Sequence, residues 1–442
     1  MPMMNVLLEF EAAQPEAFAA FSAASESAEE AVSAAESLLD SVAGLGVELE
    51  KARTPVPMFS APEVGEPMEK LAAFSGPQEN EDMSSAGSIV AARVPDDRFE
   101  QLVEHPAVRV WPNSELTLIG QAEAPPAVDC KPFEPAVPMA EIEAALGVQA
   151  LWDAGHTGRG IVVGIVDEGV DGSTYPVKGG FSPPGFQAPG EAEVTSHGSM
   201  CAADVLLAAP DATLYDYPFL GPPRSGDALE MFQAVLDQRR IDGTPHLTNN
   251  SYGFTSVPPR SEAADSEIWD LNHPLHRKVR EVVASGAAAF FAAGNCGADC
   301  PTGRCKQSGI GPGKSIHASN SLSEVITVAA VNHRGTRIGY SSQGPGMFES
   351  RKPDISSYSH FFGNFGEGRP GGTDSESFDS GTSAATPVAC GVAALLLNAN
   401  PTASPAALKA ALIGGAEAVP SAGWDADLGH GIVHAGGALA AM

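Results

Sequence analysis

The sequence has few basic residues and no long apolar run. Its 442 residues contain 25 Lys and Arg against 55 Asp and Glu, which gives a formal net charge of −30. Such a surface repels phosphate backbones, so we expect no nucleic-acid partner. No run of eighteen apolar residues occurs, so we expect no membrane partner either. The first eleven residues lack the pattern of a secretory signal, which predicts a cytoplasmic protein unless a non-classical route exports it.

Cysteine is also scarce, with six residues at Cys130, Cys201, Cys296, Cys300, Cys305 and Cys390. This is too few for a disulfide scaffold in a chain of this length. The cluster Cys296, Cys300 and Cys305 leaves three hypotheses open: a disulfide with one thiol left over, a metal site, or free thiols. No fourth ligand for zinc is obvious, and a reducing cytosol argues against a stable disulfide. We therefore predict no metal site and no required cofactor, although the acidic side chains leave Ca²⁺ possible.

Residues 1–119 form a small unit in which alternating apolar segments surround helical ones. Strands are expected at 5–11, 47–53, 88–94 and 108–118, and helices at 25–42 and 95–104. The order βαββαβ is typical of a ferredoxin-like α+β domain. Residues 55–87, rich in Pro, Ser and Gly, are predicted to be a mobile insert. A proline-rich linker is expected at 120–137.

Residues 138–442 have a different pattern, in which apolar runs alternate with helical segments. The run at 161–166 is typical of a strand buried on both faces of a parallel sheet. Further strands are expected at 287–292 and 325–331. Helices are expected at 197–209, 227–240, 273–285, 382–398 and 405–414. This pattern predicts an α/β domain with a mainly parallel sheet whose strands are buried on both faces.

Three segments of this second domain carry reactive side chains. Asp167 directly follows the strand at 161–166, at the sheet edge where active sites of α/β proteins lie. His197 begins one helix and Ser383 begins another, where unpaired backbone N–H groups are available. Each residue alone has a structural explanation as a cap or a core side chain. In the chain order Asp, His, Ser they predict an activated nucleophile with its base and orienting carboxylate.

The motifs around these residues resemble those of the subtilisin-like (subtilase) serine peptidases over residues 140–442. The matching segments are Val163–Gly169, Ser196–Ala202, Phe291–Asn295 and Ser380–Pro387, together with the strand Asn249–Gly253. The resemblance implies a subtilisin-like three-layer fold and a serine endopeptidase acting on polypeptides through an acyl-enzyme. It places the triad at Asp167, His197 and Ser383 and an oxyanion donor at Asn295. It assigns substrate binding to Ser251, Tyr252, Gly253, Ala292 and Gly294.

The first domain also resembles part of this family. Residues 88–118 are similar to the second half of its inhibitory pro-peptide. The resemblance implies an intramolecular inhibitor whose tail, Ser114–Gln121, lies in the cleft and is cut near Leu118–Gln121.

Several residues depart from the family pattern. Glu168 stands where Thr or Ser is usual, which either raises the histidine pKa or points into solvent. After Asp354 a usual motif is missing, and 356–372 is expected to be a loop. Cys201, four residues after His197, is either a reactive thiol under the triad or an inert buried one. Two alternatives stay open: a dedicated processing peptidase for one precursor, and a catalytically silent binding protein with the same fold.

Overall fold

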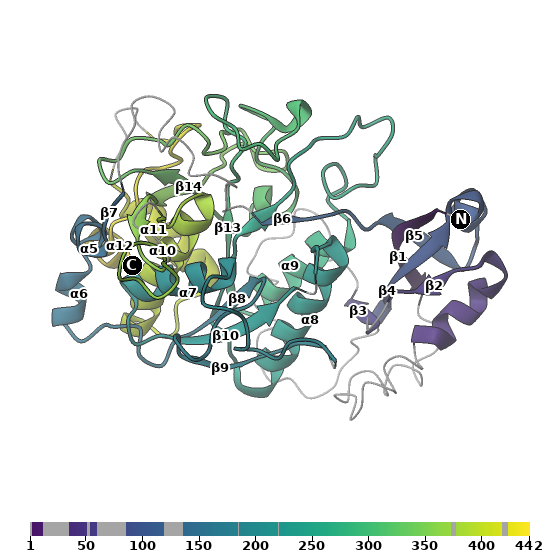
Figure 1. Ribbon diagram of the computed structural model, residues 1–442, viewed down its shortest axis with the longest axis horizontal. Helices are drawn as coiled ribbons and strands as arrows, with labels where there is room; N and C mark the ends of the chain where they lie inside the picture. The colour runs from purple at the N-terminus through teal and green to yellow at the C-terminus, as the bar shows by residue number, and fades with distance from the viewer. Residues whose placement is uncertain are drawn as a thin grey trace.

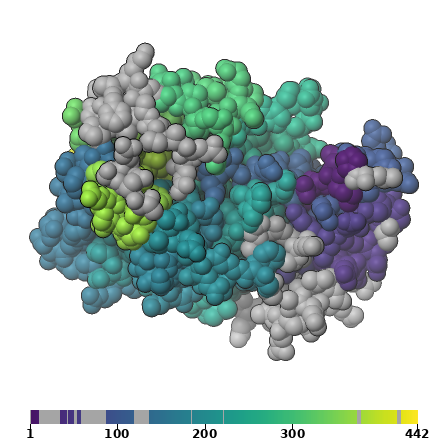
Figure 2. All heavy atoms as spheres, in the orientation of Figure 1, coloured from purple at the N-terminus to yellow at the C-terminus, as the bar shows by residue number. Residues whose placement is uncertain are grey.

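The computed structural model describes residues 2–11, 35–50, 54–59, 85–118, 136–183, 185–219, 221–372, 377–417 and 423–442. A small N-terminal domain, purple to blue in Figure 1, lies beside a larger α/β domain coloured from blue to yellow. The space-filling view shows the small domain at one end of the larger one (Figure 2).

The larger domain is organised around a seven-stranded sheet in which the paired strands run parallel. The strand order is β15-β14-β13-β11-β8-β10-β9. The strands are β8 (Val162–Asp167), β9 (Val177–Gly180), β10 (Thr213–Pro218), β11 (Leu247–Asn250), β13 (Ala288–Ala292), β14 (Ile326–Val331) and β15 (Ile355–Tyr358). The predicted α/β class and the strands near 161, 287 and 325 are confirmed.

Helices cover both faces of this sheet, because successive side chains of a strand point to opposite faces. In β13, Phe290 joins one apolar cluster and Phe291 joins another. The first cluster contains α5 (Met139–Leu146), α6 (Gln149–Asp153), α7 (His197–Ala208), α10 (Thr382–Ala399), α11 (Pro405–Gly414) and α12 (Ala435–Ala440). The second contains α8 (Ser225–Asp242) and α9 (Pro274–Ala284). The expected three layers are thus present.

Helix α10 is almost entirely buried by the surrounding elements. By length and composition it could cross a membrane, but 89% of the stretch is buried inside the protein. It packs against α7 and against the ends of several strands. Its hydrophobicity therefore serves the core of the larger domain.

The small domain has an antiparallel sheet in the order β2-β4-β1-β5. Its strands are β1 (Met3–Glu11), β2 (Glu48–Leu49), β4 (Ser85–Pro95) and β5 (Val108–Pro112). A 3-10 turn (Asp96–Arg98) and α4 (Phe99–Val103) connect β4 to β5. The four predicted strands lie in ferredoxin-like order. The predicted helix at 25–42 falls largely outside the described residues; its described part is α-helical at 35–39 and continues as a 3-10 helix, Asp40–Leu45.

Several predictions about local structure need correction within the described residues. The stretch 55–87 begins with β3 (Val56–Phe59), a fifth strand that pairs with β4, whereas residues 60–84 of the predicted insert lie outside the described residues. Pro57 made a strand here look improbable from the sequence, but proline is tolerated on an edge strand. The stretch 356–372 contains most of β15 and also β16 (Phe361–Phe362). The strand β16 pairs with β7 (Val137–Pro138), so the expected linker ends before residue 137.

A further correction concerns the predicted strand at 108–118, which is two strands. It breaks after Pro112, where the chain leaves the small sheet and reaches α8. There the Asn113 side chain accepts a hydrogen bond from the backbone N–H of Gly226 (2.9 Å). Because the first N–H groups of a helix need external acceptors, this contact supplies one at the start of α8. The second part, β6 (Thr117–Leu118), lies against the larger domain.

The two domains meet along α8 and α9. Alternate residues of the small sheet, including Leu7, Ile89 and Trp111, pack together with Leu229 of α8. Lys278 of α9 is fully buried at this contact. Its ammonium donates to the carbonyl of Pro57 in β3 (2.7 Å) and to Gln233 Oε1 (2.8 Å), and it pairs with Glu281 (2.6 Å). The unexpected strand β3 is thus part of the domain contact.

We expect Lys278→Met to weaken this contact, because it leaves the Pro57 carbonyl and Gln233 without their donor while keeping most of the side-chain volume. The free energy of unfolding should fall by about 1–3 kcal/mol. Amide hydrogen exchange at 56–59 should accelerate. Lys178→Met, at an exposed lysine of β9, is the control. Unchanged exchange at 56–59 would show that the buried lysine does not hold β3.

Candidate active site

The predicted catalytic side chains meet at the carboxyl edge of the parallel sheet. Asp167 is the last residue of β8. This strand lies between β10 and β11. The strands β9 and β10 that follow it in sequence lie on one side of it, and β11, β13, β14 and β15 lie on the other. His197 is the first residue of α7 and Ser383 the second residue of α10. Ligands of α/β sheets bind at such a switch point, outside the carboxyl ends of the strands.

A short hydrogen bond joins the first two of these residues. His197 Nδ1 lies 2.7 Å from Asp167 Oδ1, and both side chains are almost fully buried. Burial alone would lower the pKa of His197, but the charge and hydrogen bond of Asp167, with the charge of Glu168, raise it above its ordinary value. The other ring nitrogen, Nε2, is buried without a hydrogen-bond partner among the described residues. The imidazole is therefore oriented on one side and free on the other.

Ser383 lies against strand β11. Its hydroxyl donates to the backbone carbonyl of Ser251 (3.3 Å), and the Ser251 hydroxyl donates to the carbonyl of Ser383 (3.2 Å). Asn249 Nδ2 donates in turn to Ser251 Oγ (3.0 Å). These contacts fix the first turn of α10 to the end of β11. No hydrogen bond joins Ser383 to His197 in this arrangement of the described residues, and such bonds often form only when substrate is bound.

Asn295 lies just beyond the end of β13, and its side chain is held from one side. The backbone N–H and the hydroxyl of Thr382 both donate to Asn295 Oδ1, at 2.9 and 3.0 Å. Because a backbone N–H can only donate, the oxygen must face Thr382 and the NH₂ group must point away. The preceding Gly294 has φ of +109°, and a Cβ there would lie 2.8 Å from Ser342 Oγ. Only glycine fits this turn without displacement.

Cys201 lies beneath these residues and is fully buried. Its sulfur is 3.8 Å from Asp167 Oδ2, 4.0 Å from His197 Nδ1 and 3.7 Å from the Ser383 carbonyl. Asp167, His197 and Cys201 are close enough to share a metal ion. However, burial raises the pKa of the Cys201 thiol well above its ordinary value, and metals bind the thiolate. Cys201 therefore fits an inert buried thiol better than a ligand.

Two polar residues near His197 support the start of α7. The Glu168 carboxylate accepts a hydrogen bond from the backbone N–H of His197, so Glu168 anchors the helix as well as adding charge beside the imidazole. Ser199 Oγ contacts Ser196 Oγ (2.9 Å), donates to the Glu193 carbonyl (3.1 Å) and accepts from the Asp171 backbone N–H (2.9 Å). The Ser199 hydroxyl is thus engaged in the local turn.

The predicted substrate strand carries a segment of the small domain. In β12 (Tyr252–Gly253), Tyr252 pairs with Leu118 and Gly253 with Thr117 in antiparallel register. Leu116 packs beside Tyr252 in the apolar cluster on that face of the sheet. Asn320 Nδ2, which the sequence reasoning missed, donates to the carbonyls of Tyr252 (2.7 Å) and Ala292 (2.8 Å). Because Asn320 joins β12 to the end of β13, the five predicted substrate-binding residues lie in two segments, 251–253 and 292–294, that the same side chain connects.

The loop after Asn295 is closed by a disulfide between Cys296 and Cys305. Cys300 is also disulfide-bonded, whereas Cys201 and Cys390 are free. The metal-site and free-thiol hypotheses for this cluster are therefore wrong, and the disulfide hypothesis holds except that no thiol of the cluster is left over. The loop also presents Arg304, whose Nη1 donates to the carbonyl of Leu118 (3.4 Å). Nothing in the sequence singled out Arg304, because its contact depends on how the loop closes.

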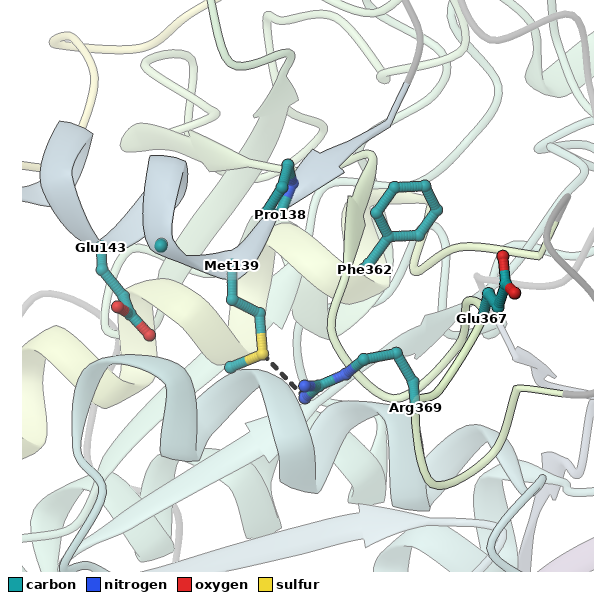
Figure 3. Close-up of a pocket in the computed structure, with 7 residues that line it drawn as sticks. Pro138, Met139, Glu143, Phe362, Glu367 and Arg369 are labelled. Atoms are coloured by element: carbon teal, nitrogen blue, oxygen red, sulfur yellow. Dashed lines mark hydrogen bonds between the residues drawn. The ribbon is translucent and has the colours of Figure 1, made fainter.

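A pocket of about 640 Å³ lies apart from these residues, where β7, β16 and α5 meet (Figure 3). It is lined by Pro138, Met139, Ala140, Glu143, Phe362, Glu367 and Arg369. Figure 3 shows Arg369 reaching toward Met139, with Glu143 and Glu367 on opposite sides; Arg369 Nη2 lies 2.9 Å from the Met139 sulfur. None of the predicted site residues lines this pocket.

Comparison with known proteins agrees with the geometry at the sheet edge. Residues 158–431 match the Subtilase family. Serine protease AprX of Bacillus subtilis is 28% identical over 301 residues, covering 59% of this chain and 62% of that protein. Subtilisin E of Bacillus subtilis is 29% identical over 265 residues, covering 57% and 59%. A calcium-dependent protease of Trichormus variabilis is 29% identical over 301 residues, covering 59% and 42%.

A solved structure shows the same fold. Fervidolysin from Fervidobacterium pennivorans, described as a keratinolytic enzyme related to subtilisin, aligns with a TM-score of 0.61 at 18% identity. The alignment covers 99% of this chain and 61% of that one. The chain thus spans less than two thirds of the length of each of these proteins. With a family match over more than half of its length, the chain belongs to the subtilase family.

Proposed function

We propose that the protein is a serine endopeptidase that cleaves polypeptides through Asp167, His197 and Ser383. The observation that carries this proposal is the buried 2.7 Å contact between Asp167 and His197, with His197 Nε2 left without a partner among the described residues. Ser383 is held at the same sheet edge through Ser251 and touches Cys201, which also lies beside His197. The AprX and subtilisin relatives, named as proteases, support this assignment.

The chemistry follows from the states of these groups. A serine hydroxyl needs a base to become a nucleophile, and neutral His197 accepts its proton through Nε2. Asp167 fixes the other nitrogen as the N–H donor and stabilises the imidazolium that results. The Asn295 NH₂ group and the Ser383 backbone N–H are the proposed donors to the tetrahedral oxyanion. His197 then protonates the leaving amine, and water hydrolyses the acyl-enzyme with the same base.

We also propose that the small domain is an intramolecular inhibitor that the enzyme removes by autocleavage. Its segment Thr117–Leu118 pairs with β12 as an extended substrate would. A substrate strand continued by one residue in this register faces Ser251, whose carbonyl accepts from the Ser383 hydroxyl. The chain that follows Leu118 is therefore the proposed cleavage region.

Calcium remains a prediction for this chain. Two relatives are named calcium-dependent proteases. Calcium takes six to eight oxygen ligands, and acidic side chains commonly supply several. Within the described ranges the one cluster of potential metal ligands is Asp167, His197 and Cys201, which includes a nitrogen and a sulfur. That cluster lacks the all-oxygen ligand set that Ca²⁺ prefers, and the proposed mechanism needs no metal ion.

The disulfides bear on where the protein works. They persist in oxidising compartments and are rare in a reducing cytosol. The Cys296–Cys305 bond therefore favours an oxidising location over the cytoplasmic one expected from the absence of a leader pattern. We propose export by a route that the first residues do not reveal, which fractionation of the source cells would test.

The proposal predicts that Ser383→Ala abolishes both covalent labelling and self-cleavage. Wild-type protein should react with a fluorophosphonate and lose residues 1 to about 119, as followed by intact mass. Ser383→Ala should do neither, because the nucleophile is gone. Ser199→Ala is the matched control, since it removes another serine hydroxyl near His197 that is engaged in the turn at α7.

The outcomes separate the alternatives. If Ser199→Ala loses labelling while Ser383→Ala keeps it, the nucleophile has been assigned to the wrong serine. If wild type labels yet stays full length, the peptidase proposal stands and autocleavage fails. If wild type does not label even after limited proteolysis of the small domain, the protein is a silent member of the family. Casein hydrolysis against defined peptides then distinguishes a general peptidase from a dedicated processing enzyme.

A second prediction concerns Asn295. Asn295→Ala should lower kcat by about 10²–10³ with little change in KM, the loss known for the corresponding asparagine of subtilisin. Its amide would contact the oxyanion only after the carbonyl becomes tetrahedral. Because Thr382 would lose its acceptor, the control is the Thr382→Val variant, which removes the hydroxyl and its contacts with Asn295 Oδ1 and the Gly294 backbone N–H but keeps the Asn295 amide. An equal rise in KM and fall in kcat would argue for general disruption instead.

A further inference from the structure

Arg304 lies at the proposed substrate strand without belonging to any recognised motif. It is exposed, and its guanidinium donates to the carbonyl of Leu118, the residue that pairs with Tyr252 of β12. This is its one hydrogen-bond acceptor among the described residues. A guanidinium has five N–H donors, so most of them remain available to another ligand.

The position of Arg304 is set by the loop that carries it. The Cys296–Cys305 disulfide closes the loop directly beside the arginine. The backbone N–H of Thr302 donates to the Asn295 carbonyl (3.0 Å), and that of Lys306 donates to the Thr255 carbonyl (2.8 Å). The chain is therefore held on both sides of Arg304: to Asn295 through Thr302, and to Thr255, beyond β12, through Lys306.

The charge of Arg304 also reaches the catalytic histidine. Burial and three charged groups set the pKa of His197: burial and Arg304 lower it, whereas Asp167 and Glu168 raise it. The protein as a whole carries a net charge of −30 and repels acidic ligands. The positive charge of Arg304 offsets this repulsion beside β12, where a substrate strand must bind.

We propose that Arg304 is a specificity-determining residue that binds the backbone carbonyl of a substrate at the place of Leu118 and selects an acidic side chain on the acyl side of the scissile bond. This inference rests on the proposed peptidase function. The chain's own segment Leu116–Leu118 carries no carboxylate, so it uses the carbonyl contact alone. A substrate with Glu or Asp beside that carbonyl adds a charge-assisted hydrogen bond.

The test uses the processed enzyme and peptide pairs that carry Glu or Gln at each of the last three positions before the cleavage site. Wild type should prefer Glu at one of these positions by about two- to fivefold in kcat/KM, the size of an exposed ion pair. Arg304→Gln should lose this preference, mainly through KM. Lys306→Gln, which removes an exposed charge two residues away in the same segment, should keep it.

A second readout follows from the charge effect on His197. Removing the positive charge of Arg304 raises the pKa of the imidazole, which must be neutral to act as a base. The acid limb of kcat/KM should therefore move to higher pH in Arg304→Gln and move less in Lys306→Gln. A purely structural role of Arg304 would not shift this limb.

Fluorophosphonate labelling separates the two proposals, because the small probe does not need the acyl-side contacts. If wild type and Arg304→Gln both label but show the same Glu preference and the same acid limb, the role of Arg304 is refuted and the peptidase stands. If wild type does not label, the peptidase proposal fails and this one fails with it.

Discussion

All the chemistry of this chain depends on the shared direction of its central strands. Because paired strands of the sheet run parallel, their carboxyl ends meet at one edge. Asp167, Ser251 and Asn295 reach that edge from β8, β11 and β13. Residues that are 128 positions apart in sequence, from 167 to 295, are thereby placed around one histidine. Helices α7 and α10 bring His197 and Ser383 to the same place.

Helix α10 holds Ser383 in place because the helix itself is packed into the core. The apolar side chains of α10 are buried almost without exception, so the helix cannot slide without opening the core. Its first turn is fixed by Asn295 through Thr382 and by Ser251 through Ser383. The core that stabilises the domain therefore also fixes the positions of the site residues. A change that loosens the packing of α10 should also displace Ser383.

The features that could be predicted from the sequence are those encoded by a short local pattern of residues. Buried parallel strands such as β8 are continuous apolar runs, and Asp167, His197, Ser383 and Asn295 lie within short sequence motifs. Features that depend on distant partners could not be predicted. The strand β3 forms because β4 offers an edge and Lys278 offers a donor to Pro57. The break after Pro112 depends on the helix start at Gly226.

The disulfide loop and Arg304 were missed for the same reason. Three cysteines within ten residues are compatible with several states, and only the folded loop decides between them. Arg304 gains a role only when the loop closes beside a strand from the other domain. The Asn320 contacts to two separate strand ends likewise have no signature in the local sequence.

The antiparallel pairing of β6 with β12 has a kinetic consequence, since both strands belong to one molecule. Under the proposed function the first bond that this enzyme breaks is its own, and tethering makes that event unimolecular, with a rate that does not depend on protein concentration. Cutting the tether removes no contact at Lys278, Leu229 or Asn113. The severed domain would then leave at the pace of its dissociation, so mature activity would appear after a lag that dilution shortens by preventing rebinding.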